Sequence, residues 1–333
     1  MAQSSARDGQ AGDSIGLHSW TVAGEAGADA CPACGTPANT RWLTVPDRFH
    51  ARTEPYDLAR CGSCSLVWLH NRPLVDGMWR HYGDRYDRSV IAAGGDANRW
   101  RGRRATLLAF ESQGKLLDIG CSSGGFLASL RSPSWQLFGI EMSEWAAKLA
   151  RERSGAEVLV GDALDARFAP GTFDAITCFH VLEHLPQPAE VLARIGEWLK
   201  PGGIFYVMTP NIDSVGARVF GSYWYALEVP RHLYLFSPAS LRKLCQSAGL
   251  EELSLTTHRE LFIERSARYI VDDLLGRVGI SRVPPAEAGP PSVLWRVVRR
   301  MARWSLEPAL RWVASLAGDG ESIHAVFRKP LLT

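Results

Sequence analysis

The sequence lacks the features that would place the chain in a membrane or in an export pathway. Its 333 residues contain no run of 18 apolar residues, so no segment is expected to span a bilayer as an apolar helix. The N-terminus has no basic start followed by an apolar block, the pattern of a secretory signal. Net charge is nearly absent, because 37 basic and 35 acidic side chains leave +2, and no global charge favours nucleic acid. We therefore expect a cytoplasmic protein.

A glycine-rich turn between an apolar strand and a helix is the most informative segment. It covers residues 116–126, Leu-Leu-Asp-Ile-Gly-Cys-Ser-Ser-Gly-Gly-Phe. Glycines let a ligand approach the backbone closely, and the helix N-terminus presents free N–H groups, so the turn suits one end of a nucleotide. Position 122, where a dinucleotide fingerprint would need glycine, is Ser. Asp118 would repel a pyrophosphate but attract an ammonium group.

Two acids follow at the spacing expected of a nucleotide-binding fold. Glu141 ends a strand expected over 135–140, twenty-one residues after Gly120, where a carboxylate can accept both ribose hydroxyls. Asp162 comes after the next strand. The further strands expected here cover 158–160, 173–178 and 204–208. Strands that alternate with helices predict an α/β fold with a parallel sheet covered on both faces, and a Rossmann-type domain for another nucleotide is the alternative.

From about residue 100 to 258 these elements resemble the class I S-adenosylmethionine-dependent methyltransferases. Motif I of that family reads (D/E)-x-G-x-G-x-G, and Ser122 stands here in place of the middle glycine. The resemblance implies a Rossmann-like sheet and S-adenosylmethionine as cofactor, with Asp118 on the methionine ammonium, Glu141 on the ribose and Asp162 on the adenine amino group. The cofactor-site residues that it implies are Asp118, Gly120, Ser122, Gly124, Glu141, Met142, Asp162, Ala163 and Phe179.

Four of the seven cysteines form two pairs with a two-residue spacer. The pairs are Cys31 with Cys34, and Cys61 with Cys64. Such a spacer lets both thiolates of a pair reach one metal ion, and four sulfurs predict a closed, structural Zn2+ site. Disulfides are the alternative, but without an export signal a reducing compartment favours the metal. We expect a zinc-ribbon domain over 29–75, with strands at 41–45 and 65–69.

Four cysteines in this pattern ahead of motif I resemble the branch of the class I methyltransferases that carries an N-terminal zinc ribbon. Its better-known members C-methylate nucleotide-linked deoxysugars. The resemblance implies a small-molecule acceptor, either sugar-containing or another secondary metabolite. Those sugar methyltransferases are usually longer, with an additional C-terminal α/β domain. Because the tail of this chain differs, the sugar itself is not carried over.

Candidate acceptor-side residues follow the fourth strand. His180, Glu183 and His184 lie at i, i+3 and i+4, and would share one face if a helical turn forms. Histidine accepts protons near neutral pH, and a nearby carboxylate raises its basicity, so both histidines are candidate bases. The alternative is that the Glu-His pair only orients the turn. Quinone-biosynthesis O-methyltransferases are similar here, with an acid-x-x-Glu-His cluster that binds a divalent ion, but His180 replaces the first acid and counts against a metal.

A second acceptor-side segment, residues 223–238, follows the fifth strand. It combines aromatic side chains with Arg231 and His232, and leads into a helix that Ser237 is expected to cap. Aromatic rings with polar tips suit a partly apolar acceptor, which makes His232 a further candidate base; an ordinary packing loop is the alternative. The Asn/Asp-Pro-Pro-aromatic run of nucleobase methyltransferases does not follow the fourth strand, which counts against nucleic acid as acceptor.

The C-terminal part contains an insertion between two expected strands, 252–256 and 322–327. The insertion spans 259–321 and predicts a helical stretch to Val278, followed by a long helix over 292–316. Arginines gather on one side of the long helix, and Trp, Val and Met lie elsewhere around it. This helix either packs on the protein or a partner, or lies in a membrane interface.

Four parts are therefore expected along the chain. They are a disordered tail over 1–28, the zinc ribbon over 29–75, a methyltransferase domain over 76–258 and 322–330, and the helical insertion over 259–321. The predicted function is S-adenosylmethionine-dependent methyl transfer to a small molecule. One alternative is an O-methyltransferase on a lipid-linked or quinone-type acceptor, with peripheral membrane contact through 292–316. The other is a non-catalytic zinc-ribbon adapter that binds nucleic acid or protein.

Overall fold

The computed structural model describes residues 30–36, 40–50, 52–73, 81, 97–260, 262–277, 293, 297, 300, 301, 304 and 320–331. The tail predicted over 1–28 and most of the helix predicted over 292–316 lie outside these residues. The five described residues of that helix are helical and exposed. Within the described ranges, no helix has the length and apolar character needed to cross a bilayer.

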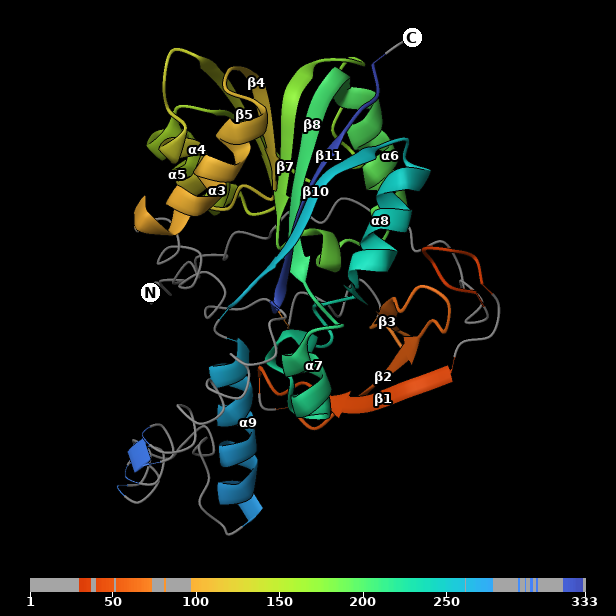
Figure 1. The fold of residues 1–333 in the computed structure, drawn as a ribbon. Coiled ribbons are helices and arrows are strands. Elements are labelled where there is room, and N and C mark those ends of the chain that lie inside the picture. Colours follow the sequence, from red (N-terminus) through yellow and green to blue (C-terminus); the bar gives the residue numbers. More distant parts are fainter. Residues whose placement is uncertain are drawn as a thin grey trace, which may run out of the picture.

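A seven-stranded sheet forms the centre of the molecule (Figure 1). Its strands, in spatial order, are β10 (Glu251–His258), β11 (Ser322–Arg328), β8 (Leu199–Pro210), β7 (Phe173–Phe179), β4 (Gly114–Ile119), β5 (Trp135–Glu141) and β6 (Glu157–Val160). The strands from β8 to β6 are parallel, and β11 pairs antiparallel with both β8 and β10. The predicted Rossmann-like α/β sheet is confirmed, with every predicted strand of the sheet present.

Both faces of the sheet are buried because successive side chains along each strand point to opposite sides. Leu116 and Tyr206 belong to the apolar layer beneath α3 (Ala97–Phe110), α4 (Gly125–Ser129) and α5 (Glu144–Ser154). Their neighbours Leu117 and Phe205 belong to the layer beneath α6 (Pro188–Trp198) and α8 (Pro238–Ser247). Figure 1 shows the two groups of helices on opposite sides of the sheet. The cap predicted for α8 is confirmed, since Ser237 forms a capping box with Ser240.

The cysteine-bearing segment forms a second sheet that borrows a strand from the C-terminal half. Its order is β1 (Thr40–Pro46), β2 (Pro55–Arg60), β3 (Val67–Leu69) and β9 (Tyr234–Leu235), all antiparallel. The strands predicted at 41–45 and 65–69 are present, the second in shortened form, whereas β2 and β9 were not predicted. Buried ribbon residues such as Leu58 and Leu66 share one apolar cluster with α6 and α8. The ribbon therefore shares one apolar core with these two helices.

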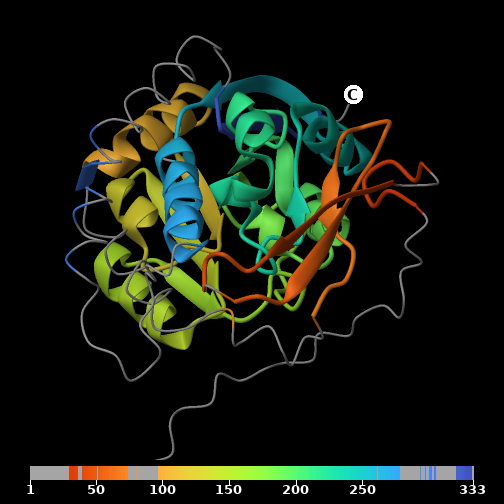
Figure 2. The same ribbon diagram turned by 90° about the horizontal axis from the view of Figure 1, so that it is seen from below.

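The ribbon and two helices gather at the edge where the parallel strands end. Figure 1 shows α7 (Val215–Phe220) and β1–β3 below the lower edge of the sheet. Seen from below in Figure 2, α9 (Phe262–Arg277) crosses in front of this edge, with β1–β3 to one side. The helical stretch predicted to Val278 is thus present as α9. Ligands of open α/β sheets bind at the carboxyl edge, and here that edge is lined by loops, the ribbon and α9.

Candidate functional site

The turn after β4 has the conformation that its glycines predict. Gly120 has φ 70°, and a Cβ there would come within 2.3 Å of Val181 Cγ2. Gly124 has φ 73° and precedes α4, where a Cβ would lie 2.7 Å from the Ala150 backbone. Ser122 adopts the same left-handed region, with φ 52°, so it fills a glycine-like position at a cost in backbone strain. The turn keeps the shape of motif I despite the substitution.

Asp118 lies buried near the end of β4. The strand order reverses at β4, because β5 and β6 lie on one side of it and β7 and β8 lie on the other. Its Oδ1 accepts a hydrogen bond from the Thr177 hydroxyl at 2.7 Å. Burial raises the pKa of Asp118 to about 7, although the hydroxyl and the charge of Arg103 act in the opposite direction. A cationic partner that displaces the proton would bind favourably here, as expected for an ammonium group.

Glu141 closes the turn from the neighbouring strand. Its two oxygens accept the backbone N–H groups of Ser122 at 2.8 Å and Ser143 at 3.0 Å. Burial raises the pKa of Glu141, and these backbone N–H groups oppose the shift. Asp162, after β6, accepts the N–H of Leu164 at 2.7 Å, and Met142 is an exposed apolar side chain beside Glu141. The acids predicted for ribose and adenine thus stand at consecutive strand ends.

Phe179, a predicted cofactor-site residue, lies at the same edge. Next to it lies the cationic side chain of Arg103, which was not predicted from the sequence. The Phe179 ring packs edge-on against Phe126 and Tyr206, with ring centroids 4.9 and 4.8 Å apart. The guanidinium of Arg103, from α3, lies 5.3 Å from the Phe179 centroid. Ala163 is buried beside Asp162. Arg103 was missed because α3 carries several arginines, and only tertiary packing turns this one toward the site.

Three histidines and two glutamates meet at the end of β7. His180 has φ 57°, and its Nδ1 lies 3.4 Å from Glu183 Oε1. The predicted helical turn is reduced to a short 3-10 segment, Leu182–His184, that starts after His180. His184 and His232 lie with ring centroids 4.6 Å apart, although 48 residues separate them in sequence. Glu228, not predicted from sequence, lies 3.0 Å from His232 Nε2. All three predicted bases therefore belong to one cluster.

Comparison with known proteins shows the family to which the chain belongs. The family model of a methyltransferase domain matches residues 93–255. The ubiquinone biosynthesis O-methyltransferase of Thiobacillus denitrificans (strain ATCC 25259 / T1) is 36% identical over 170 residues, which are 47% of this chain and 72% of that relative. The chain belongs to the class I S-adenosylmethionine-dependent methyltransferases. The prediction of S-adenosylmethionine-dependent methyl transfer is confirmed. The assignment of the motif I turn and of the acids at the strand ends to the cofactor stays a prediction.

Two further proteins agree with this membership. The ubiquinone biosynthesis O-methyltransferase of Paraburkholderia xenovorans (strain LB400) is 30% identical over 177 residues, 47% of this chain and 76% of that relative. Phosphoethanolamine N-methyltransferase 2 of Haemonchus contortus, solved in complex with S-adenosyl-L-methionine, superposes with a TM-score of 0.51 at 17% identity. That superposition covers 79% of this chain and 62% of the other, and shows the shared fold. The ribbon over 30–73 lies outside the family match.

The hydrogen bonds of the methyltransferase assign different protonation states to His184 and His232. His184 Nδ1 lies 3.0 Å from the Arg231 carbonyl, which can only accept, so the proton sits on Nδ1 and the lone pair on Nε2. Burial and the charge of His232 lower the pKa of His184 to about 4. At neutral pH His184 is therefore neutral.

His232 is instead a buried cation. Its Nδ1 faces the Ala226 carbonyl at 2.7 Å and its Nε2 faces Glu228 Oε2 at 3.0 Å, so both nitrogens donate. Burial lowers the pKa of His232, but the hydrogen bond and charge of Glu228 and the charge of Glu183 outweigh it, and the net pKa is raised. A doubly donating imidazole has no lone pair for a metal. The quinone-type metal cluster therefore does not fit these residues, although Glu183, His184 and His232 lie within 4.8 Å.

The four cysteines come together as the sequence predicts. Cys31 Sγ lies 3.5 Å from Cys64 Sγ, and Cys34 Sγ lies 3.6 Å from Cys61 Sγ. In a tetrahedral Zn2+ site with Zn–S distances of about 2.3 Å, sulfurs lie about 3.8 Å apart. All four cysteines are free, which disagrees with the disulfide alternative. The donor set and its geometry fit one Zn2+ ion.

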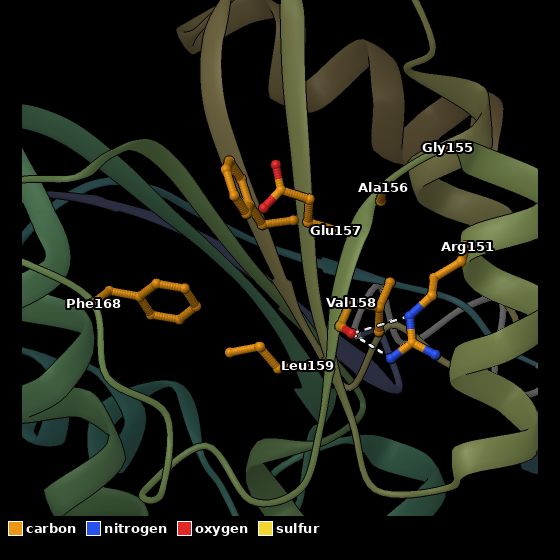
Figure 3. A pocket seen from close by; sticks show the side chains of 8 residues that line it. Arg151, Gly155, Ala156, Glu157, Val158, Leu159 and Phe168 are labelled. Atoms are coloured by element: carbon orange, nitrogen blue, oxygen red, sulfur yellow. Dashed lines mark hydrogen bonds between the residues drawn. The ribbon is translucent and has the colours of Figure 1, made fainter.

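A separate cavity lies at the β6 edge of the sheet, away from the histidine cluster. It has a volume of about 470 Å³ and is lined by residues of α5 and β6 together with Phe138 and Phe168 (Figure 3). Arg151 donates two hydrogen bonds to the Val158 carbonyl there, at 3.1 and 2.5 Å. These bonds satisfy the Val158 carbonyl on the edge strand β6. The cavity contains none of the predicted site residues.

Proposed function

We propose that this methyltransferase methylates a hydroxyl oxygen on a small ring-containing acceptor of the quinone-precursor type. The observation that carries the proposal is the pairing of a neutral His184 with a cationic His232 at the end of β7. The fixed charge of His232 stabilises the developing oxyanion of a weakly acidic hydroxyl, and this compensates for the low proton affinity that the same charge gives to the neutral His184. The names of the relatives, ubiquinone biosynthesis O-methyltransferases, support the same acceptor class.

In this proposal each group has one role. S-adenosylmethionine supplies an electrophilic methyl group, and Asp118, Glu141 and Asp162 hold its ammonium, ribose and adenine. Arg103 suits the carboxylate of the methionine moiety, because it is a cation beside Asp118. His184 takes the hydroxyl proton on Nε2.

The remaining parts of the proposal concern the ribbon and the other acceptor classes. One structural Zn2+ ion on the four cysteines holds the ribbon. A sugar-containing acceptor stays the main competing hypothesis, and contact with a membrane through 292–316 stays a prediction. Neither hypothesis requires nucleic acid as a partner.

The acceptor proposal is tested by supplying S-adenosylmethionine with either catechol-type phenols or nucleotide-linked deoxysugars, and by locating the new methyl group with mass spectrometry and NMR. We expect a methyl ether on a phenolic oxygen. His184→Asn should lower kcat by about a hundredfold, the usual contribution of a positioned base, without changing affinity for S-adenosylhomocysteine. His70→Asn, an exposed histidine of the ribbon, is the matched control. A methylated sugar carbon, with phenols inert, contradicts the proposal.

A further inference from the structure

A second group of metal-ligating side chains lies in the ribbon, apart from the four cysteines. Asp47 directly follows β1, His50 lies in the same turn, and His81 comes from beyond β3. One carboxylate oxygen and one nitrogen of each imidazole lie within 4.8 Å of one another. No local motif links these residues, because His50 and His81 are 31 positions apart in the sequence.

The two imidazoles point at the same carboxylate oxygen. His50 Nδ1 lies 2.9 Å and His81 Nδ1 lies 3.0 Å from Asp47 Oδ2. The other oxygen, Oδ1, accepts the backbone N–H of His50 at 3.0 Å, which holds the carboxylate in place. The side chains of Asp47 and His81 are fully buried, and that of His50 is 16% exposed. A buried carboxylate needs a compensating partner, and two nitrogens already converge on it.

We propose that Asp47, His50 and His81 form a second cation site, which binds Zn2+ through two imidazole nitrogens and one carboxylate oxygen. With Zn–N and Zn–O distances of about 2.0–2.1 Å, ligand atoms of a tetrahedral ion lie about 3.3 Å apart. The observed separations of 2.9 and 3.0 Å need to widen only slightly for an ion to enter. With Nδ1 bound to the ion, each imidazole carries its proton on Nε2.

The donor set also selects the class of ion. Imidazole nitrogen suits Zn2+ and neighbouring transition metals, whereas Mg2+ and Ca2+ require several oxygen ligands. Three protein ligands leave the fourth position of a tetrahedral ion to water. The partial exposure of His50 gives such an ion a route from solvent.

An ion at this site would also affect how the ribbon contacts the acceptor-side loop. The same turn contacts the acceptor-side loop through its two central residues. Phe49 lies under the guanidinium of Arg231, 3.9 Å from its ring centroid. Arg48 lies 4.0 Å from the Tyr223 centroid and donates to the Ser222 carbonyl at 3.2 Å. An ion bound to this turn would therefore hold the ribbon against the loop that carries His232.

The test counts and identifies zinc in the full-length protein after loading with ZnCl2 and desalting. We expect two Zn2+ ions per chain, and an X-ray absorption spectrum with a sulfur shell near 2.3 Å together with a nitrogen and oxygen shell near 2.0–2.1 Å. Asp47→Asn and His50→Gln should each retain one ion with a sulfur-only shell. His70→Gln, at an exposed ribbon position, should retain both ions.

Each possible result either supports the second zinc site or contradicts it. One ion per chain with a sulfur-only shell in the unmodified protein overturns the proposal, because Asp47 then only accepts hydrogen bonds from two histidines. A second ion that persists in Asp47→Asn and His50→Gln also overturns it, since that ion binds elsewhere. A single ion with a nitrogen and oxygen shell supports this site and contradicts zinc on the cysteines. The sulfur-bound ion that the variants retain shows that their ribbon is folded, and the measurements on the unmodified protein need no substitution.

Discussion

Disrupting the four-cysteine site should disorder the loop that carries His232 while leaving the cofactor site intact. The ribbon holds this loop through the β3–β9 pairing, through a hydrogen bond from the Leu69 N–H to the Leu233 carbonyl at 2.9 Å, and through one from the Ser237 hydroxyl to the Cys64 carbonyl at 2.9 Å. At roughly 1 kcal/mol net for each of the two named hydrogen bonds and for the short strand pairing, these contacts contribute about 3 kcal/mol. Their loss changes the population of the ordered loop on the order of a hundredfold.

The assay compares Cys61→Ser with the unmodified protein by amide hydrogen exchange and by calorimetry with S-adenosylhomocysteine. Three thiolates cannot close the site, so we expect peptides covering 226–236 to lose protection. Peptides covering 114–141 should keep their protection. The cofactor affinity should change by less than about threefold, because the lost contacts lie far from the cofactor site and distant sites act almost independently. Cys245→Ser, which removes a buried thiol that is not part of the four-cysteine site, is the matched control.

Two results would refute this reasoning. Unchanged exchange in 226–236 would show that the loop is ordered without the ribbon. A loss of cofactor affinity together with exchange protection throughout the sheet would show that the ribbon and the cofactor domain unfold as one cooperative unit.

Three other predictions concern the cofactor and the insertion. Glu141→Ala should weaken S-adenosylhomocysteine binding by ~1.5–3 kcal/mol, measured by calorimetry, and unchanged affinity would remove Glu141 from the site. Burial raises the pKa of Asp118 to about 7, so the affinity for S-adenosylhomocysteine should rise as pH rises toward 7 and level off above it. Asp118→Asn should abolish this pH dependence. A flat pH profile in the unmodified protein contradicts the assignment of Asp118 to the ammonium group. If 292–316 is interfacial, anionic vesicles should pellet the protein at low salt, less so after Arg299→Glu with Arg303→Glu, and no pelleting rejects it.

Local sequence pattern was sufficient for most of the sheet and for the cofactor turn. A run such as 116–126 specifies its own backbone, because an apolar strand, glycines at left-handed positions and a helix start are properties of neighbouring residues. The same holds for the capping box at Ser237 and for the two cysteine pairs. The acids at positions 141 and 162 were found since parallel strands of similar length end at one edge.

The acceptor side could be predicted only in part. His180, His184 and His232 were recognised as chemically suitable, but their partners were not. Glu228 sets the charge of His232, and the Arg231 carbonyl sets the tautomer of His184. Both contacts depend on how the loop before β9 folds back, and no periodic pattern in the sequence predicts the conformation of that loop.

The sequence by itself determined the order of strands and helices around the central sheet, the motif I turn and the two cysteine pairs, because each depends on residues that lie close together in the chain. Tertiary structure decided what pairs across long separations: β3 with β9, Arg103 with Phe179, and His81 with Asp47. The physical reason is that such contacts arise where distant segments bury apolar side chains in a common cluster, which brings together the polar groups at the edge of that cluster. Burial then sets their charge states, as it does for His184 beside His232.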